Sequence, residues 1–166
     1  MKCPLTDPTY RSIIAHRGGA GRAPENTIPA LAGARALGAD AVEFDVRMSR
    51  DGEVVVIHDP TVDRTTDGRG AVLDLSAGAL GGLDAGARFS TDGGRTFPFR
   101  GQGIGVPRLA DVLETLRDMP LLIEIKVAAA LAPTVALLER FGAVGRAVVA
   151  AADHAAVAPA RGGALR

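Results

Sequence analysis

The chain has 166 residues, of which 47% are hydrophobic and 23% charged, and its 19 basic and 19 acidic residues give no formal net charge. This is the composition of one ordinary globular domain, and the balanced charge argues against a basic field that gathers nucleic acid or anionic lipid. The single cysteine, Cys3, excludes an internal disulfide. We expect a soluble, cytoplasmic protein, because no signal peptide opens the chain and no apolar run reaches the ~18 residues of a membrane helix.

The apolar residues alternate between strand-like and helix-like spacing along the chain. Strands are predicted over 12–15, 41–46, 54–57, 121–127 and 146–150, and helices over 28–37, 109–116 and 133–141. Thr27 is placed to cap the first helix and Gly38 to end it. Strands that alternate with helices in this order predict an α/β fold with parallel strands and right-handed crossovers.

The segment from 61 to 107 interrupts this alternation. It is rich in Gly, Asp and Arg and contains one modest strand candidate, 71–73. Such a stretch is typical of a functional insertion or lid, although its polar run 90–96 fits a solvated hairpin equally well. After Ala151 the composition turns to Ala, Pro and Gly, which predicts one more helix or a loose tail. His154 lies in this tail and is expected to have no catalytic role.

Charged residues stand inside two strands whose other residues are apolar. Glu43 and Asp45 are two positions apart, so both side chains project from the same face of their strand. Glu124 and Lys126 repeat this arrangement in a later strand. A parallel strand that is buried on both faces is normally apolar throughout, so these charges indicate a site.

Two histidines, His16 and His58, each stand where an apolar run ends and a turn begins. Ligand sites in α/β folds gather at the carboxyl ends of strands, so we expect the histidines and the strand carboxylates to meet at one mouth. Carboxylates at about 4 Å and an effective dielectric of about 20 repel by about 4 kcal/mol per pair. Lys126 offsets part of this repulsion, and a Mg²⁺ or Ca²⁺ ion with oxygen ligands would offset the rest.

Each of these residues also has an ordinary structural interpretation. A strand-end histidine can be a hydrogen-bonded surface residue, Asp59-Pro60 can be simple turn chemistry, and Glu124 and Lys126 can form an inward ion pair. The acidic pair at 43 and 45 can face solvent on an edge strand. All of these interpretations would have to hold together, each placing charge among apolar neighbours, so we favour one shared site.

Several short motifs follow one another in a characteristic order. They are His16-Arg17-Gly18, Glu25-Asn26-Thr27, Glu43-Phe44-Asp45-Val46, His58-Asp59 and Glu124-Ile125-Lys126, together with Arg64-Thr65-Thr66, Gly68 and Gly70. From Ile13 to Val127 the chain thereby resembles the glycerophosphodiester phosphodiesterase family. The resemblance implies a (β/α)₈ TIM barrel with a small insertion after the second histidine. It also implies hydrolysis of glycerophosphodiesters, the deacylated remains of phospholipids, to glycerol 3-phosphate and an alcohol.

The resemblance implies a role for each motif residue. One divalent cation, Mg²⁺ or Ca²⁺, would be held by Glu43, Asp45 and Glu124. His16 and His58 would be the acid–base pair, and Arg17 and Lys126 would bind the phosphate. Glu25 and Asn26 would brace the first strand end. These roles suit the chemistry, because positive groups neutralise a phosphodiester and histidines titrate near neutral pH. Which histidine is the acid, and whether water or a glycerol hydroxyl attacks first, stays open.

The length differs from that of a complete barrel, which has ~250 residues. About five strand–helix units are counted here, so we expect residues 1–166 to be a partial, truncated phosphodiesterase domain with 61–107 as its insertion. The chain would be an active phosphoric diester hydrolase with a small-molecule substrate, or a weak or inactive fragment that binds a cation or phosphate ester or needs a partner chain. A third interpretation, a barrel enzyme acting on intact phospholipids or sphingolipids, is disfavoured by the neutral charge. Nucleic acid binding and stable membrane insertion are not expected, and head group, native metal and oligomeric state stay open.

Overall fold

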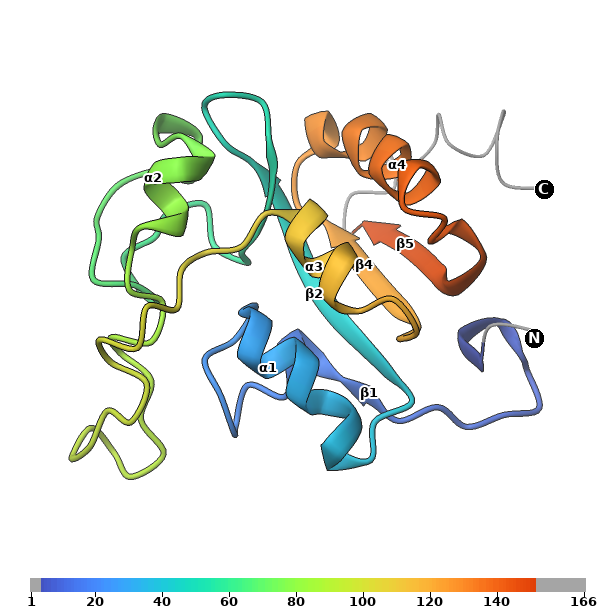
Figure 1. Ribbon diagram of the computed structural model, residues 1–166, viewed down its shortest axis with the longest axis horizontal. Helices are drawn as coiled ribbons and strands as arrows, with labels where there is room; N and C mark the ends of the chain where they lie inside the picture. Colours follow the sequence, from blue (N-terminus) through green and yellow to red (C-terminus); the bar gives the residue numbers. More distant parts are fainter. Residues whose placement is uncertain (1–3, 152–166) are drawn as a thin grey trace.

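The computed structural model describes residues 4–151, in which helices pack on a five-stranded sheet (Figure 1). The strands are β1 (Ile14–Ala15), β2 (Ala41–Met48), β3 (Val54–Val56), β4 (Leu121–Ile125) and β5 (Ala147–Ala151). The α-helices are α1 (Ile28–Gly33), α2 (Ala77–Gly81), α3 (Leu109–Thr115) and α4 (Leu131–Arg140). Short 3-10 turns are η1 (Pro4–Thr6), η2 (His16–Gly18), η3 (Ala34–Leu37), η4 (Val72–Asp74), η5 (Ala128–Ala130) and η6 (Val144–Arg146). Cys3 and His154 lie outside the described residues, and no helix within them is long and apolar enough to cross a bilayer.

The sheet is parallel except at one strand. Its order is β1-β2-β4-β5, and each neighbouring pair in this path is parallel, as the alternation of strands and helices predicts. β3 instead pairs antiparallel with the carboxyl-terminal part of β2, from Val46 to Met48. Only residues 49–53 connect these two strands, and a parallel connection needs a crossover of a dozen or more residues. The expectation of parallel strands throughout is therefore wrong for β3.

Alternate residues of β2 face opposite sides of the sheet. Val42, Phe44 and Val46 are buried in one apolar cluster with side chains of α1, α3 and α4. α1 contacts α3 and α3 contacts α4, so these helices cover the same face (Figure 1). Burial of each large side chain here contributes about 1.5–3 kcal/mol. The packing of this face leaves Glu43 and Asp45 to project from the other one.

The segment 61–107 has a small apolar cluster of its own. Val62, Val72, Leu80 and Val106 are buried there, together with Ile57 just after β3. The strand predicted at 71–73 is wrong: this stretch is mostly the turn η4, and Ala71 forms only an isolated bridge with Thr61. The segment lies beside the carboxyl ends of β1 and β2 in Figure 1 (green to yellow). Its action as a lid stays a prediction.

The first helix begins after Thr27, as predicted, but is capped differently. The Thr27 hydroxyl donates to the carbonyl of Pro24 and makes no capping bond to the helix. α1 ends at Gly33, and the turn η3 continues to Gly38, whose left-handed conformation (φ 82°) ends the helical path. The predicted end is thus correct, although the last turn is 3-10 in geometry.

Gly18 is expected to be important for stability because α1 packs directly against it. Its φ is +82°, and a Cβ there would lie 2.7 Å from the backbone of Ala30 and of Leu31. We expect Gly18→Ala to lower the free energy of unfolding by about 1–3 kcal/mol through overpacking, with added backbone strain. Gly38→Ala is the matched control, because Gly38 has the same φ with open space around its Cα. Urea unfolding measures both variants, and equal losses would contradict a role for the contact with α1.

Candidate active site

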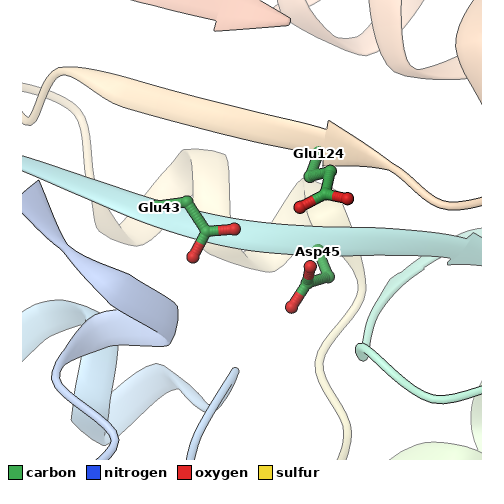
Figure 2. A group of neighbouring side chains, drawn as sticks. All are labelled: Glu43, Asp45 and Glu124. Carbon is green, nitrogen blue, oxygen red and sulfur yellow. The ribbon is translucent and has the colours of Figure 1, made fainter. Parts of the chain in front are cut away.

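Three carboxylates project from neighbouring strands into one space. Glu43 and Asp45 lie on β2, and Asp45 pairs in register with Glu124 on β4. One carboxylate oxygen of each lies within 4.8 Å of the others. Glu43 and Asp45 are buried and Glu124 is half-buried. Figure 2 shows the three side chains on the same side of the two strands, as the alternation of the sequence predicts.

Two basic side chains reach into this carboxylate cluster. Lys126 Nζ lies 2.6 Å from Glu124 Oε1 and 3.0 Å from Asp45 Oδ1, and Arg17 Nε lies 3.3 Å from Asp45 Oδ2. Burial opposes a charge on Lys126, but the attraction of the Glu124 and Asp45 carboxylates outweighs burial and raises the pKa of the ammonium. Three carboxylates against two cations leave a negative excess when all are ionised.

The negative charge of Glu43 is disfavoured by its surroundings. Burial raises the pKa of Glu43, and the negative charges of Asp45 and Glu124 act in the same direction. The backbone N–H of Arg17, 2.9 Å from Glu43 Oε2, opposes the shift. A positive ion beside Glu43 would relieve this cost.

The carboxylate cluster fits a hard divalent cation. Asp45 Oδ1 is buried and accepts no hydrogen bond from residues 4–151, since its contact with Lys126 is an ion pair without hydrogen-bond geometry. All three candidate ligands offer carboxylate oxygens, the donors that Mg²⁺ and Ca²⁺ prefer. The ordinary interpretation of Glu124 and Lys126 as an inward ion pair is also correct geometrically, but this ion pair belongs to the same cluster.

Strained backbone holds two predicted site residues against Asp45 and Glu43. Arg17 (φ 51°) and Asn26 (φ 59°) have left-handed conformations that are uncommon for residues other than glycine. Asn26 N donates to the Arg17 carbonyl at 3.1 Å, and Asn26 Nδ2 donates to Asp45 Oδ2 at 2.9 Å. Such conformations persist only where surrounding bonds hold them, and they cluster at functional sites. Asn26 therefore lies where a residue that braces the strand end would lie.

The two histidines differ in their surroundings. The His16 side chain is mostly exposed, with Nε2 3.9 Å from Glu43 Oε2. His58 is half-buried, with Nδ1 2.6 Å from Asp59 Oδ1. The hydrogen bond from Arg64 lowers the pKa of Asp59 to about 2, with His58 acting in the same direction and burial opposing them. Asp59 is therefore an anion that can only accept hydrogen bonds, so His58 Nδ1 carries the proton that it accepts. In the neutral ring Nε2 is then the unprotonated nitrogen.

This depressed pKa predicts how stability changes in acid. The ordinary pKa of about 3.8 for Asp59 falls to about 2 in the folded protein. Ionised Asp59 thus stabilises the fold above pH ~4, and this contribution is lost as the pH falls from about 4 to about 2. We expect Asp59→Asn to show a smaller decrease in the free energy of unfolding across this window, measured by urea unfolding at several pH values. An identical pH dependence in both proteins would contradict it.

Two site arginines are not assigned a role by sequence reasoning. Arg64 appears there only within a motif, yet in the structure it forms ion pairs with both Glu25 and Asp59. Arg47 donates from Nε to the backbone carbonyl of His58 at 2.8 Å. Arg47 continues the alternation of charged residues at 43 and 45, which is the signal that could have identified it. The pairing of Arg64 with Glu25 has no such local signal.

An open cavity of about 180 Å³ lies beside this site. It is lined by Glu25 and by Arg64, Arg88 and Phe89 of the insertion, among others. The three carboxylates do not contribute to its lining. The cavity therefore adjoins the carboxylate cluster through Glu25 and Arg17 but does not contain it.

Residues 16–144 match the glycerophosphoryl diester phosphodiesterase family. The chain belongs to this family. It is 44% identical over 115 residues to a glycerophosphodiester phosphodiesterase of Caldanaerobacter subterraneus subsp. tengcongensis, an alignment that covers 69% of this chain and 44% of that protein. The family resemblance carried by the sequence motifs is thus confirmed.

Solved structures of the family have the same fold. The glycerophosphoryl diester phosphodiesterase domain of a Mycobacterium tuberculosis protein superposes with a TM-score of 0.82 at 33% identity, over 90% of this chain and 56% of that one. An Oleispira antarctica phosphodiesterase, solved with its product sn-glycerol-3-phosphate, superposes with a TM-score of 0.76 at 29% identity. The superposition covers 91% of this chain and 61% of that one. The predicted TIM-barrel class is confirmed, and the chain spans about half the length of the curated relatives it matches.

Proposed function

We propose that this chain carries the hydrolytic centre of a glycerophosphodiester phosphodiesterase, which releases glycerol 3-phosphate and an alcohol. The observation that carries the proposal is the meeting of Glu43, Asp45 and Glu124 within 4.8 Å of one another on neighbouring strands. Family membership supports it, as does the Oleispira antarctica relative bound to sn-glycerol-3-phosphate. The substrate is accordingly a small, anionic phosphodiester.

The three carboxylates would hold one divalent cation, Mg²⁺ or Ca²⁺. Bound there, such an ion supplies Lewis-acid polarisation of a phosphoryl oxygen. Arg17 and Lys126 supply fixed positive charge at the same place, since each contacts Asp45. They are the residues that would bind the phosphate oxygens and stabilise the charge that develops on them.

His16 and His58 would divide the proton transfers. One accepts the proton of the attacking hydroxyl as a P–O bond forms, and the other donates a proton to the leaving alkoxide as the second P–O bond breaks. With its proton on Nδ1 held by Asp59, the neutral His58 ring can accept a proton at Nε2 and so act as the base, and it can act as the acid only after Nε2 has taken up a proton. Attack by water, or first by the neighbouring glycerol hydroxyl and then by water, leads to the same products.

A coupled assay for glycerol 3-phosphate tests the proposal. With glycerophosphocholine we expect release in the presence of Mg²⁺ or Ca²⁺ and its loss with excess chelator. No release with either ion, from protein whose thermal melt shows a folded state, would contradict the proposal.

The same samples separate the other two interpretations. Stabilisation by glycerophosphocholine in a thermal melt without turnover would favour the fragment that only binds, which the partial coverage of the relatives makes a specific alternative. Product from a lysolipid or from sphingomyelin, with none from glycerophosphocholine, would favour an enzyme that acts on intact lipids.

A further inference from the structure

Arg64 occupies a position from which it can control the orientation of His58. We propose that it is a positioning residue for the hydrolysis proposed above, on which this inference rests: Arg64 holds Asp59, and Asp59 holds the His58 ring and its Nδ1 proton. Arg64 does not reach the carboxylate cluster itself, so it would act through another residue.

The Arg64 guanidinium uses all three of its nitrogens. Nη1 and Nη2 donate to the two oxygens of Glu25 at 2.8 and 2.7 Å, and Nε donates to Asp59 Oδ2 at 2.5 Å. This forked geometry is specific to arginine, because the single ammonium of a lysine cannot reach three oxygens in fixed directions. Arg64, at the start of the insertion, therefore links Glu25 in the loop after η2 with Asp59 just after β3.

Asp59 depends on Arg64 for its orientation. Among residues 4–151 its carboxylate is hydrogen-bonded by His58 through Oδ1 and by Arg64 through Oδ2. Without Arg64, the carboxylate could rotate about its side-chain bonds and the His58 ring would lose a fixed partner. Glu25 would keep one arginine, because Arg17 Nη1 also donates to it at 2.9 Å.

Asp59 is the group that fixes the orientation of the His58 ring in the described part of the chain. Within residues 4–151, the other side-chain hydrogen bond to His58 comes from Arg47, which donates to the backbone carbonyl and not to the ring. The proton on Nδ1 is set by the anion that accepts it, so loss of a fixed Asp59 would allow the neutral ring to adopt the other tautomer. Nε2 would then carry the proton and could no longer act as an open base.

The position of Arg64 makes chemical rescue feasible. Its side chain is 49% exposed and lines the open cavity beside the insertion, so truncation leaves a space that a small cation can enter from solvent. Guanidinium in solution can restore hydrogen bonds to Glu25 and Asp59 there. A residue needed only for folding would not be rescued in this way.

The test compares Arg64→Ala and Arg64→Lys with Arg69→Ala in the whole chain. Arg69 is an exposed arginine of the same segment and forms none of the ion pairs found within residues 4–151. For Arg64→Ala we expect kcat on glycerophosphocholine to fall about 10–100-fold with little change in KM, by analogy with the loss that follows when the hydrogen-bond partner orienting a metal-site ligand is removed. Guanidinium should restore much of kcat, Arg64→Lys should stay low, and Arg69→Ala should match the wild type.

A second readout does not depend on turnover. In ¹⁵N NMR of the neutral His58 ring, assigned by its loss in His58→Ala, we expect the Nδ1–H tautomer in the wild type and a shift toward Nε2–H in Arg64→Ala. If the wild type hydrolyses nothing, the proposed function fails while this spectrum still decides the role of Arg64. An unchanged tautomer, or a loss of kcat that guanidinium does not restore, would overturn the inference. If Arg64→Ala does not fold, Arg64→Lys carries the same comparison.

Discussion

His58→Ala and His16→Ala are each expected to lower kcat for glycerophosphocholine by about 10²–10⁴-fold, the contribution typical of a general acid or base. Both side chains lie at the surface of the site, half-buried and mostly exposed respectively, so their truncation should leave the core unchanged. The coupled release of glycerol 3-phosphate measures the rates, and thermal melts measure the folded state.

His154→Ala serves as the control for this pair, because the sequence predicts no catalytic role for that histidine. It should keep the wild-type rate. Near-normal rates in both His16→Ala and His58→Ala would contradict their assignment as the acid–base pair, whatever the fate of the cation site. A large loss in only one of them would leave a single histidine to serve both proton transfers.

Glu43→Gln is expected to weaken cation binding and, at the same time, to stabilise the metal-free protein. Gln keeps the shape of Glu43 but removes a negative ligand, so affinity for Mg²⁺ or Ca²⁺ should fall by at least about tenfold. The folded-state pKa of Glu43 is raised by its burial and by its acidic neighbours. The folded protein therefore loses stability as the pH rises from the ordinary pKa of Glu43 through the raised one, because Glu43 must then ionise in an unfavourable place. Glu43→Gln removes this cost at neutral pH.

Titration calorimetry with each ion and thermal melts in chelator measure the two effects separately. Glu53→Gln is the matched control, because it makes the same chemical change at an exposed position and should alter neither quantity. Unchanged affinity in Glu43→Gln would remove Glu43 from the ligand set. Lower stability in chelator would contradict the cost that we assign to the negative charge of Glu43, because Gln can still accept the hydrogen bond from the Arg17 backbone.

The described part of the chain holds the whole predicted set of site residues. These residues run from His16 to Lys126 and follow or lie on the first four strands. The chain covers 44% of its Caldanaerobacter relative and 56% of the Mycobacterium domain. If this chain is inactive, we therefore expect the cause to be weak substrate binding or low stability and not the absence of a predicted catalytic residue.

The sequence by itself was sufficient to determine the shared face of the carboxylates. A strand has a side-chain period of two, so Glu43 and Asp45 must point the same way, and Glu124 must alternate with its apolar neighbours. These are local properties, and the helices and strands predicted from apolar spacing outside the segment 61–107 are present in the structure for the same reason, whereas the strand predicted at 71–73 is not. The motif order was also enough to identify the family, because each motif is a short contiguous run.

Only the tertiary structure decided which distant groups meet. Arg64 reaches back 39 positions to Glu25, and Lys126 enters between Asp45 and Glu124 rather than standing apart from them. β3 turned back antiparallel because its connection to β2 is short, although its apolar run looks like that of any other strand. The left-handed backbone at Arg17 and Asn26 likewise depends on bonds to β2. Contacts of this kind arise from packing between segments far apart in the chain, which no local periodicity encodes.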